Sequence, residues 1–167
     1  ADAIASPFGW HDTSGVLGAE FTTTQGNNAH AYLDQDNNNA ADFGGSPDGG
    51  PSLTFDFPAD LNQHAQNYRD AVVTNLFYAN NRFHDVAHHY GFDEPSGNFQ
   101  ANNYGRGGGQ GDYVRAEAAD GGGTNNANFS PPVETPTSGG TPRMQMFLWP
   151  GNQFGSQNQV VVDSLGS

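Results

Sequence analysis

The feature that most constrains the fold is a helical pattern of apolar residues between about Leu61 and Tyr90. Six apolar side chains there alternate at spacings of four and three, which places them along one stripe of an α-helix. Pro58–Asp60 has the character of a helix start, Gly91 that of a C-terminal cap, and Asp93–Pro95 prevents continuation. The sequence therefore predicts one long amphipathic helix. Its stripe consists of Val72, Leu76, Ala79, Phe83, Val86 and Tyr90.

Short strand candidates separated by loops rich in Gly, Asn and Pro surround this helix. Twelve Phe, six Tyr and two Trp supply the large side chains of a core. Together these features predict an α+β fold rich in short strands. The candidates are Ala29–Leu33 and Leu53–Phe57, which alternate as half-buried strands do, then Asp112–Ala116, Asn126–Phe129, Arg143–Leu148 and Val160–Val162.

Charge and cysteine content exclude several classes of function. The net charge is −13, from 18 acidic residues against five arginines, so we expect neither nucleic acid nor anionic membranes as partners. No apolar run approaches the roughly 20 residues that span a bilayer. The absence of cysteine excludes disulfides and thiolate chemistry. The polar surface, built mainly from uncharged residues, favours a secreted protein.

His84 and His88 form the first candidate site. They lie four residues apart, so both imidazoles project from one helix face, as a zinc-binding pair requires. Asp85 stands where a zinc peptidase helix carries Glu, and a third ligand would have to come from His11, Asp93 or Glu94. The alternative is that His84 and Asp85 make structural hydrogen bonds, and the sequence favours this alternative.

The loop Asp34–Asp42 is the second candidate site. Its oxygen-bearing side chains at alternate positions suit a hard cation such as calcium. The sixth position is Asn39 rather than Gly, and the twelfth is Ser46 rather than Glu, which excludes an EF-hand. A looser calcium loop and a solvated turn both remain open.

Four segments together resemble the fungalysin family of secreted zinc metalloendopeptidases. The resemblance extends over almost the whole chain, and it reaches more distantly to thermolysin-type peptidases. The segments are SPFGWHDT from Ser6, the long motif from Asn75 to Gly108, DGGGTNNANFSPP from Asp120, and PRMQMFLW from Pro142.

The resemblance implies the β-rich N-terminal subdomain of a thermolysin-like (zincin) catalytic domain, lying along one wall of the cleft. The family binds zinc through HExxH on a later helix and a downstream Glu. No HExxH occurs in this sequence, so we expect zinc to be bound by residues beyond Ser167, and the chain alone to be inactive. His84–Asp85 matches a His-Asp pair on an earlier helix of the family, which does not bind zinc.

Implied partners are protein or peptide substrates, a propeptide in the precursor zymogen, and the remainder of the catalytic domain. Without that remainder, we expect apolar surface to be exposed on the side that faces the cleft. Residues 1–149 correspond to the peptidase domain, and residues 150–167 to a connection or the start of an inserted domain.

The resemblance also implies substrate contacts. Asn125, Asn126 and Ala127 match the edge strand that pairs with an extended peptide in thermolysin-like enzymes. The competing interpretation is an internal strand with Phe129 in the core. Two other functions remain open: a noncatalytic module that binds calcium or carbohydrate, and a self-contained zinc enzyme that uses His84 and His88.

Overall fold

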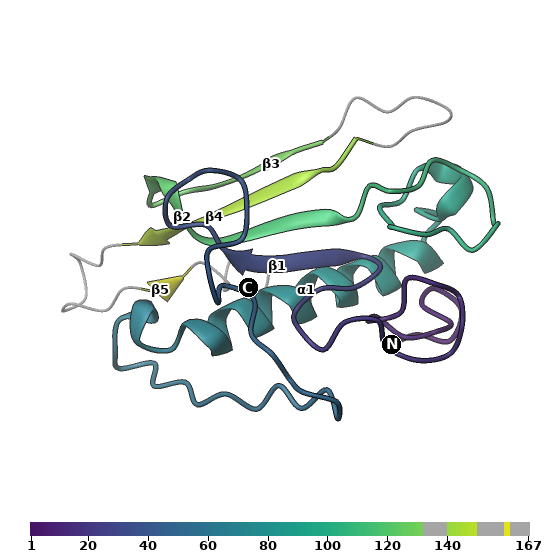
Figure 1. Cartoon of the computed structure of the whole chain (residues 1–167). Helices are drawn as coiled ribbons and strands as arrows, with labels where there is room; N and C mark the ends of the chain where they lie inside the picture. The colour runs from purple at the N-terminus through teal and green to yellow at the C-terminus, as the bar shows by residue number, and fades with distance from the viewer. Residues whose placement is uncertain (132–139, 150–158, 161–167) are drawn as a thin grey trace.

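A computed structural model describes residues 1–131, 140–149 and 159–160. It consists of one mixed sheet with one long helix against it (Figure 1). The α+β prediction and the single long helix are thereby confirmed. The elements are β1 (Ala29–Leu33), α1 (Arg69–His89), β2 (Val114–Thr124), β3 (Ala127–Ser130), β4 (Arg143–Trp149) and β5 (Gln159–Val160), with short 3₁₀ helices η1 (Ala65–Asn67) and η2 (Glu94–Ser96).

The strand order across the sheet is β1-β2-β4-β3. The first three of these strands run parallel, so their carboxyl ends lie at the same edge of the sheet. β3 pairs with β4 in the antiparallel direction, and β5 pairs with the end of β4. The predicted strand at Val160–Val162 is described only at Val160, and the expected change of domain at residues 150–167 lies outside the described residues except for β5.

One face of the sheet is apolar and packs against α1. The register pairs Ala31 with Ala116 and Leu33 with Ala118, so small side chains from neighbouring strands lie together on this face. All four of these residues are buried, and alanine adds so little bulk that the helix can approach the sheet closely. The helix contributes Val72, Val73, Leu76 and Phe77 to this core.

The other face of the sheet is polar, yet it is also buried. Tyr32 donates a hydrogen bond to Glu117 on this face, at 3.0 Å. The loop of residues 34–48 crosses this face (Figure 1). Two hydrogen bonds attach the loop to β1: Leu33 N–H donates to the carbonyl oxygen of Gly45 (3.0 Å), and His30 Nε2 lies 2.8 Å from Ser46 Oγ. β1 has the predicted bounds, but this loop buries it on both faces rather than on one.

The predicted helix is confirmed at its C-terminus and wrong at its start. Gly91, at φ 94°, donates to His88, and Phe92 donates to Ala87, which is the hydrogen-bond pattern of a Schellman cap. The helix begins at Arg69 rather than near Leu61, because residues 61–68 form turns and η1. The apolar pattern therefore placed the start of the helix about two turns too early.

Two strand predictions also differ from the structure. Leu53–Phe57 is not a strand: Leu53 has a φ of 51° and closes a turn onto Gly50. The strand predicted at Asp112–Ala116 begins at Val114 and continues through the glycine run to Thr124. It continues because Gly121 N–H donates to Asp34 and residues as far as Thr124 still pair with β4.

A buried carboxylate attaches the N-terminal segment to α1. Asp85 accepts hydrogen bonds from Ser6 Oγ (2.6 Å), Trp10 Nε1 (2.9 Å) and the backbone N–H of Asp2 (2.9 Å). Burial by itself raises the pKa of Asp85, but the hydrogen bonds, that from His84 foremost, lower it to about 2. The ionised carboxylate is thus the form that holds the two segments together.

We predict that Asp85→Asn lowers the free energy of unfolding by roughly 2–4 kcal/mol at pH 7. The variant removes the buried charge, and its side-chain NH₂ would face groups that donate hydrogen bonds to the carboxylate in the wild type. Denaturant unfolding measures this. The Asp85 pKa is lowered on folding, so its stabilisation is present above the ordinary value of 3.8 and is lost as the pH falls to about 2. The deficit of the variant should shrink over that window, whereas the exposed Asp56→Asn should unfold like the wild type.

Candidate functional site

The three predicted substrate-binding residues lie at an edge of the sheet. Asn125 and Asn126 form the connection from β2, and Ala127 begins β3. Within the described part of the chain, no strand pairs with the side of β3 that faces away from β4. Asn125 and Asn126 are exposed, and Phe129 is 43% exposed, so among the described residues β3 is an edge strand and Phe129 lies outside the core.

The main chain of β3 presents hydrogen-bonding groups on its open side. Phe147 N–H donates to the carbonyl oxygen of Asn126 (3.2 Å), so the main-chain groups of Asn126 face β4. Because these groups alternate along an antiparallel strand, those of Ala127 and Phe129 face outward. Ala127 N–H donates to the side-chain oxygen of Asn126 (2.8 Å). A peptide bound along β3 could replace that side-chain oxygen as the acceptor.

An apolar groove lies beside β3, between the sheet and the C-terminal half of α1. Phe129 forms one side of it, and Phe99 packs against Phe129 with ring centroids 5.9 Å apart. The groove has a volume of about 320 Å³ and is lined chiefly by hydrophobic side chains, among them Phe83, Phe92, Val114 and Met144.

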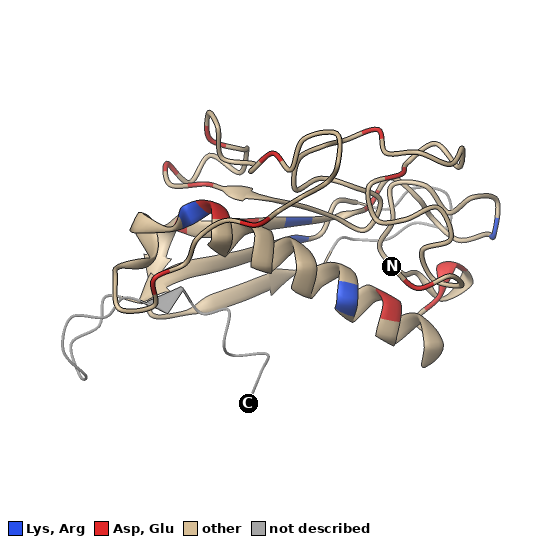
Figure 2. Cartoon of the chain, turned by 90° about the horizontal axis from the view of Figure 1, so that it is seen from below, with Lys and Arg blue, Asp and Glu red and all other residues tan. Residues whose placement is uncertain are grey.

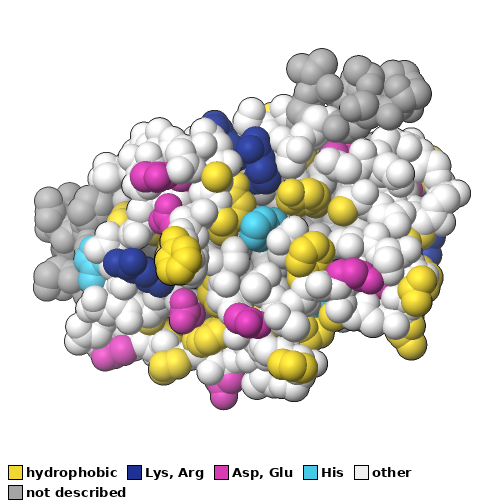
Figure 3. Space-filling model, viewed as in Figure 1, with side chains coloured by type: hydrophobic (Ala, Val, Ile, Leu, Met, Phe, Trp, Pro, Cys, Tyr) yellow, Lys and Arg dark blue, Asp and Glu magenta, His cyan; other side chains and the backbone are white. Residues whose placement is uncertain are grey.

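The predicted apolar stripe of α1 is core in its first half only. Val72 and Leu76 are buried, but Phe83 is 66% exposed and Tyr90 is 89% exposed, with Val86 between them also exposed. Phe83 also lines the groove, so the exposed half of the stripe meets the groove at this residue. On the face of the molecule drawn in Figure 3, by contrast, hydrophobic side chains lie in separate patches among polar atoms.

His84 and His88 are both hydrogen-bonded to protein groups. His84 is buried, with Nδ1 3.4 Å from Asp85 Oδ1 and Nε2 3.3 Å from Asn98 Nδ2. His88 Nε2 lies 3.2 Å from Glu94 Oε2. The structural hydrogen bonds expected of His84 and Asp85 are thus present: both ring nitrogens of His84 have protein partners, and Nε2 of His88 has one.

None of the three candidate third ligands completes a zinc site with these histidines. Glu94 does approach His88, and its other carboxylate oxygen accepts from Arg106 at 3.0 Å, so both oxygens of Glu94 already have protein partners. The His11 ring stacks on Phe55, and Asp93 caps η2. Among the described residues, both groups of three neighbouring metal-ligand side chains consist of carboxylates.

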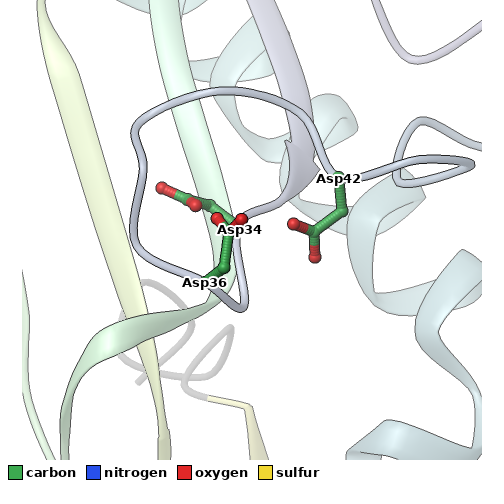
Figure 4. Close-up of side chains that lie close together, drawn as sticks. All are labelled: Asp34, Asp36 and Asp42. Carbon is green, nitrogen blue, oxygen red and sulfur yellow. The ribbon is translucent and has the colours of Figure 1, made fainter.

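The first of these carboxylate groups is the loop predicted from the sequence. Asp34, Asp36 and Asp42 offer oxygen atoms within 4.8 Å of one another. Figure 4 shows the three side chains close together, with Asp34 and Asp36 adjacent and Asp42 on the returning part of the loop. Asp34 is buried, and it accepts from the backbone N–H groups of Asn38 and Asn39, both at 2.9 Å.

The second carboxylate group was missed by sequence reasoning. Asp34 also lies within the same 4.8 Å limit of Glu117 and Asp120, and all three are buried. Burial, together with the neighbouring Asp120 and Asp34, raises the pKa of Glu117 to about 7. Both Glu117 and Asp120 lie after the strand predicted at Asp112–Ala116, and nothing in the sequence indicated which loop would cover them.

The other acidic residues lie on several loops and on the helices, as Figure 2 shows. The chain has five arginines and no lysine. Within the described residues, α1 is too polar to be a candidate for crossing a bilayer, and no shorter helix qualifies.

Comparison with known proteins identifies the family. The model of the fungalysin metallopeptidase family (M36) matches residues 1–163. An extracellular metalloproteinase (MEP) of Leptosphaeria maculans is 41% identical over 149 residues, which is 89% of this chain and 22% of the relative. Extracellular metalloproteinase 2 of Phaeosphaeria nodorum is 41% identical over 152 residues, 90% of this chain and 23% of the relative.

A third relative, the extracellular metalloproteinase MEP of Fusarium vanettenii, is 43% identical over 132 residues, 78% of this chain and 20% of the relative. The chain thus spans about a fifth of the length of the curated relatives it matches. Since the family model extends over nearly all of its residues, the chain belongs to the fungalysin metallopeptidase family.

Proposed function

We propose that this chain is part of a secreted zinc metalloendopeptidase that hydrolyses peptide bonds in proteins. In that enzyme it forms one wall of the active-site cleft and aligns the substrate along β3. Family membership supports peptidase activity over a noncatalytic module that binds calcium or carbohydrate. The names of the relatives, extracellular metalloproteinases, support secretion.

The open side of β3 is the observation that carries the proposal. An extended peptide can add to such an edge as a further strand, because main-chain hydrogen bonds hold it without reading its sequence. Ala127 would supply N–H and C=O groups, Asn126 would release its side-chain oxygen from Ala127 N–H, and Asn125 would position the turn. The small Ala127 side chain leaves room for the peptide.

The described residues do not fit zinc. Zinc prefers histidine and cysteine ligands, whereas the two neighbouring groups of possible ligands here are all carboxylates and the chain has no cysteine. Zinc would therefore be bound by residues outside this chain. Calcium, the other ion expected from the sequence, would bind elsewhere, near the loop of residues 34–42.

We predict that the 167-residue chain alone hydrolyses no peptide, with or without added zinc, in a fluorogenic peptide assay. Hydrolysis that disappears with a chelator and in His88→Ala would contradict this and would make His88 a ligand. Tyr90→Ala, an exposed change two residues away, serves as the matched control.

We predict that Ala127→Pro, introduced into the complete enzyme, lowers kcat/KM for peptides about tenfold, because one outward N–H is lost from substrate alignment. Ala127→Gly keeps that N–H and should retain activity. Steady-state kinetics on both variants, with unfolding temperatures to confirm folding, tests the role of the strand. An equal loss in both variants, or none in the proline variant, contradicts it.

The remainder of the catalytic domain is the partner that we propose for the apolar surface beside β3. The surface combines the groove with the exposed half of the α1 stripe, where the described residues leave the apolar side of the helix uncovered. Soluble domains rarely leave such a continuous patch open to water. A covering segment there would also lie next to β3, since Phe129 belongs to both.

We predict that the isolated chain self-associates through this surface, because apolar surface without its partner binds to itself. Phe83→Glu should shift the chain toward the monomer in sedimentation velocity. Phe43→Glu changes another exposed phenylalanine, in the loop after β1, and should leave association unchanged. A wild-type chain that is monomeric at high concentration would contradict the prediction.

A further inference from the structure

We propose that Asp34, Glu117 and Asp120 bind a calcium ion between the sheet and the loop of residues 34–42. This site is separate from the proposed peptidase site, and it would attach the loop to the sheet. Asp34 directly follows β1, whereas Glu117 and Asp120 belong to β2. Because β1 and β2 are parallel neighbours, the three carboxylates meet where β1 ends.

The first argument is the position of Asp120. Ala119 has a φ of 51° and stands at a shift in register, between the pair Ala118–Met146 and the pair Asp120–Phe147. Without this bulge, alternation would place residue 120 on the apolar face with Ala118. The bulge instead turns Asp120 to the polar face, beside Glu117.

The second argument is the spacing of the oxygen atoms. One oxygen from each of the three carboxylates lies within 4.8 Å of the other two. Calcium binds oxygen at about 2.3–2.6 Å, so two ligands of one ion are separated by no more than about 5 Å. The observed spacing therefore admits one shared ion. Asn37 Oδ1 is a fourth oxygen nearby, since it and Asp120 Oδ1 both lie within 2.8 Å of the point that a Cβ on Gly122 would occupy.

The third argument is a buried oxygen with no hydrogen bond. Glu117 has no exposed surface; Oε1 accepts from Tyr32, but Oε2 accepts from no group. The nearest cation is Arg143 Nε, at 3.8 Å, which is too far for a hydrogen bond. A buried carboxylate oxygen without a donor is costly, and a bound cation would remove that cost.

The protein's own cations neutralise the group only in part, since Arg143 forms an ion pair of 3.8 Å with Glu117 alone. Arg143 and Arg115, which share the polar face with Glu117, both donate to Asn39 in the covering loop. Asp36 and Asp42 add two further carboxylates on the loop side of Asp34 (Figure 4). The negative charge around Asp34 therefore exceeds the positive charge, and oxygen ligands alone favour a hard divalent ion.

Calcium is the ion that fits best. Calcium accepts irregular coordination by carboxylate oxygens, whereas magnesium demands an octahedron and retains several waters. The three carboxylates are buried, so little space exists for such waters. We expect calcium to bind more tightly than magnesium.

The test is thermal unfolding and titration calorimetry of the 167-residue chain with calcium. Calcium at a hundredfold excess over its Kd should raise the Tm by about 5 °C or more, and magnesium at the same concentration should have a smaller effect. Unchanged Tm and no binding heat at millimolar calcium would overturn the proposal.

Glu117→Gln distinguishes a ligand from a structural carboxylate. This variant keeps the acceptor for Tyr32 but removes the charge. In chelator its Tm should be higher than that of the wild type, because repulsion among the acidic residues is relieved. In calcium its Tm should be lower than that of the wild type, because a ligand is lost. A purely structural role would give the same sign in both conditions, which would overturn the proposal.

Asp36→Asn is the matched control, because it removes one charge from the exposed part of the same loop. It should retain calcium binding, with a loss in affinity of no more than about fivefold, an effect expected from one exposed charge. Loss of binding in Asp36→Asn together with retention in Glu117→Gln would contradict the proposed ligand set.

Terbium, a luminescent substitute for calcium, locates the ion independently of stability. Tyr32 Oη lies 3.0 Å from Glu117 Oε1, so an ion at this site would be close enough for the phenol to sensitise its emission. Tyr32→Phe should remove most of the sensitised emission, whereas Tyr78→Phe, on the exposed side of α1, should not. The opposite pattern would place the ion elsewhere and overturn the proposal.

Discussion

The structure depends on the alternation of side chains across β1, β2 and β4. Every second residue of these strands faces α1, and these residues are mostly small and apolar, such as Ala31 and Ala116. The intervening residues are mostly polar, yet they too are buried or half-buried, because the chain folds back over them after β1. Two different interactions therefore hold the two faces: hydrophobic packing on one, and hydrogen bonds with charges on the other.

The elements that the sequence predicts well are those determined by local chemistry. Ala29–Leu33 alternates clearly, and its bounds are confirmed. The end of α1 is equally local, because Gly91 adopts the left-handed conformation that closes a Schellman cap. β4 was predicted within one residue of its end, since Arg143–Leu148 alternates between flanking loops.

The errors arise where distant residues decide the local structure. Leu53–Phe57 alternates like a strand, but no described strand lies beside it, and Phe55 stacks on His11 instead. β2 passes through a glycine run because β4 pairs with it. Glu117 and Asp120 could not be joined with Asp34 from sequence, because their meeting requires the parallel pairing of β1 with β2 and a bulge at Ala119.

The apolar stripe of α1 shows why such a partial error is informative. The helical spacing of Val72 to Tyr90 is a property of the sequence, and the burial of only its first half is a property of the fold. A stripe that continues past its own core indicates a second contact, and here the groove beside Phe129 leads from that stripe to the open edge of β3. If the remainder of the catalytic domain covers this surface as proposed, its catalytic groups come to lie next to the edge strand. The segment that covers this apolar surface would then also complete the active-site cleft.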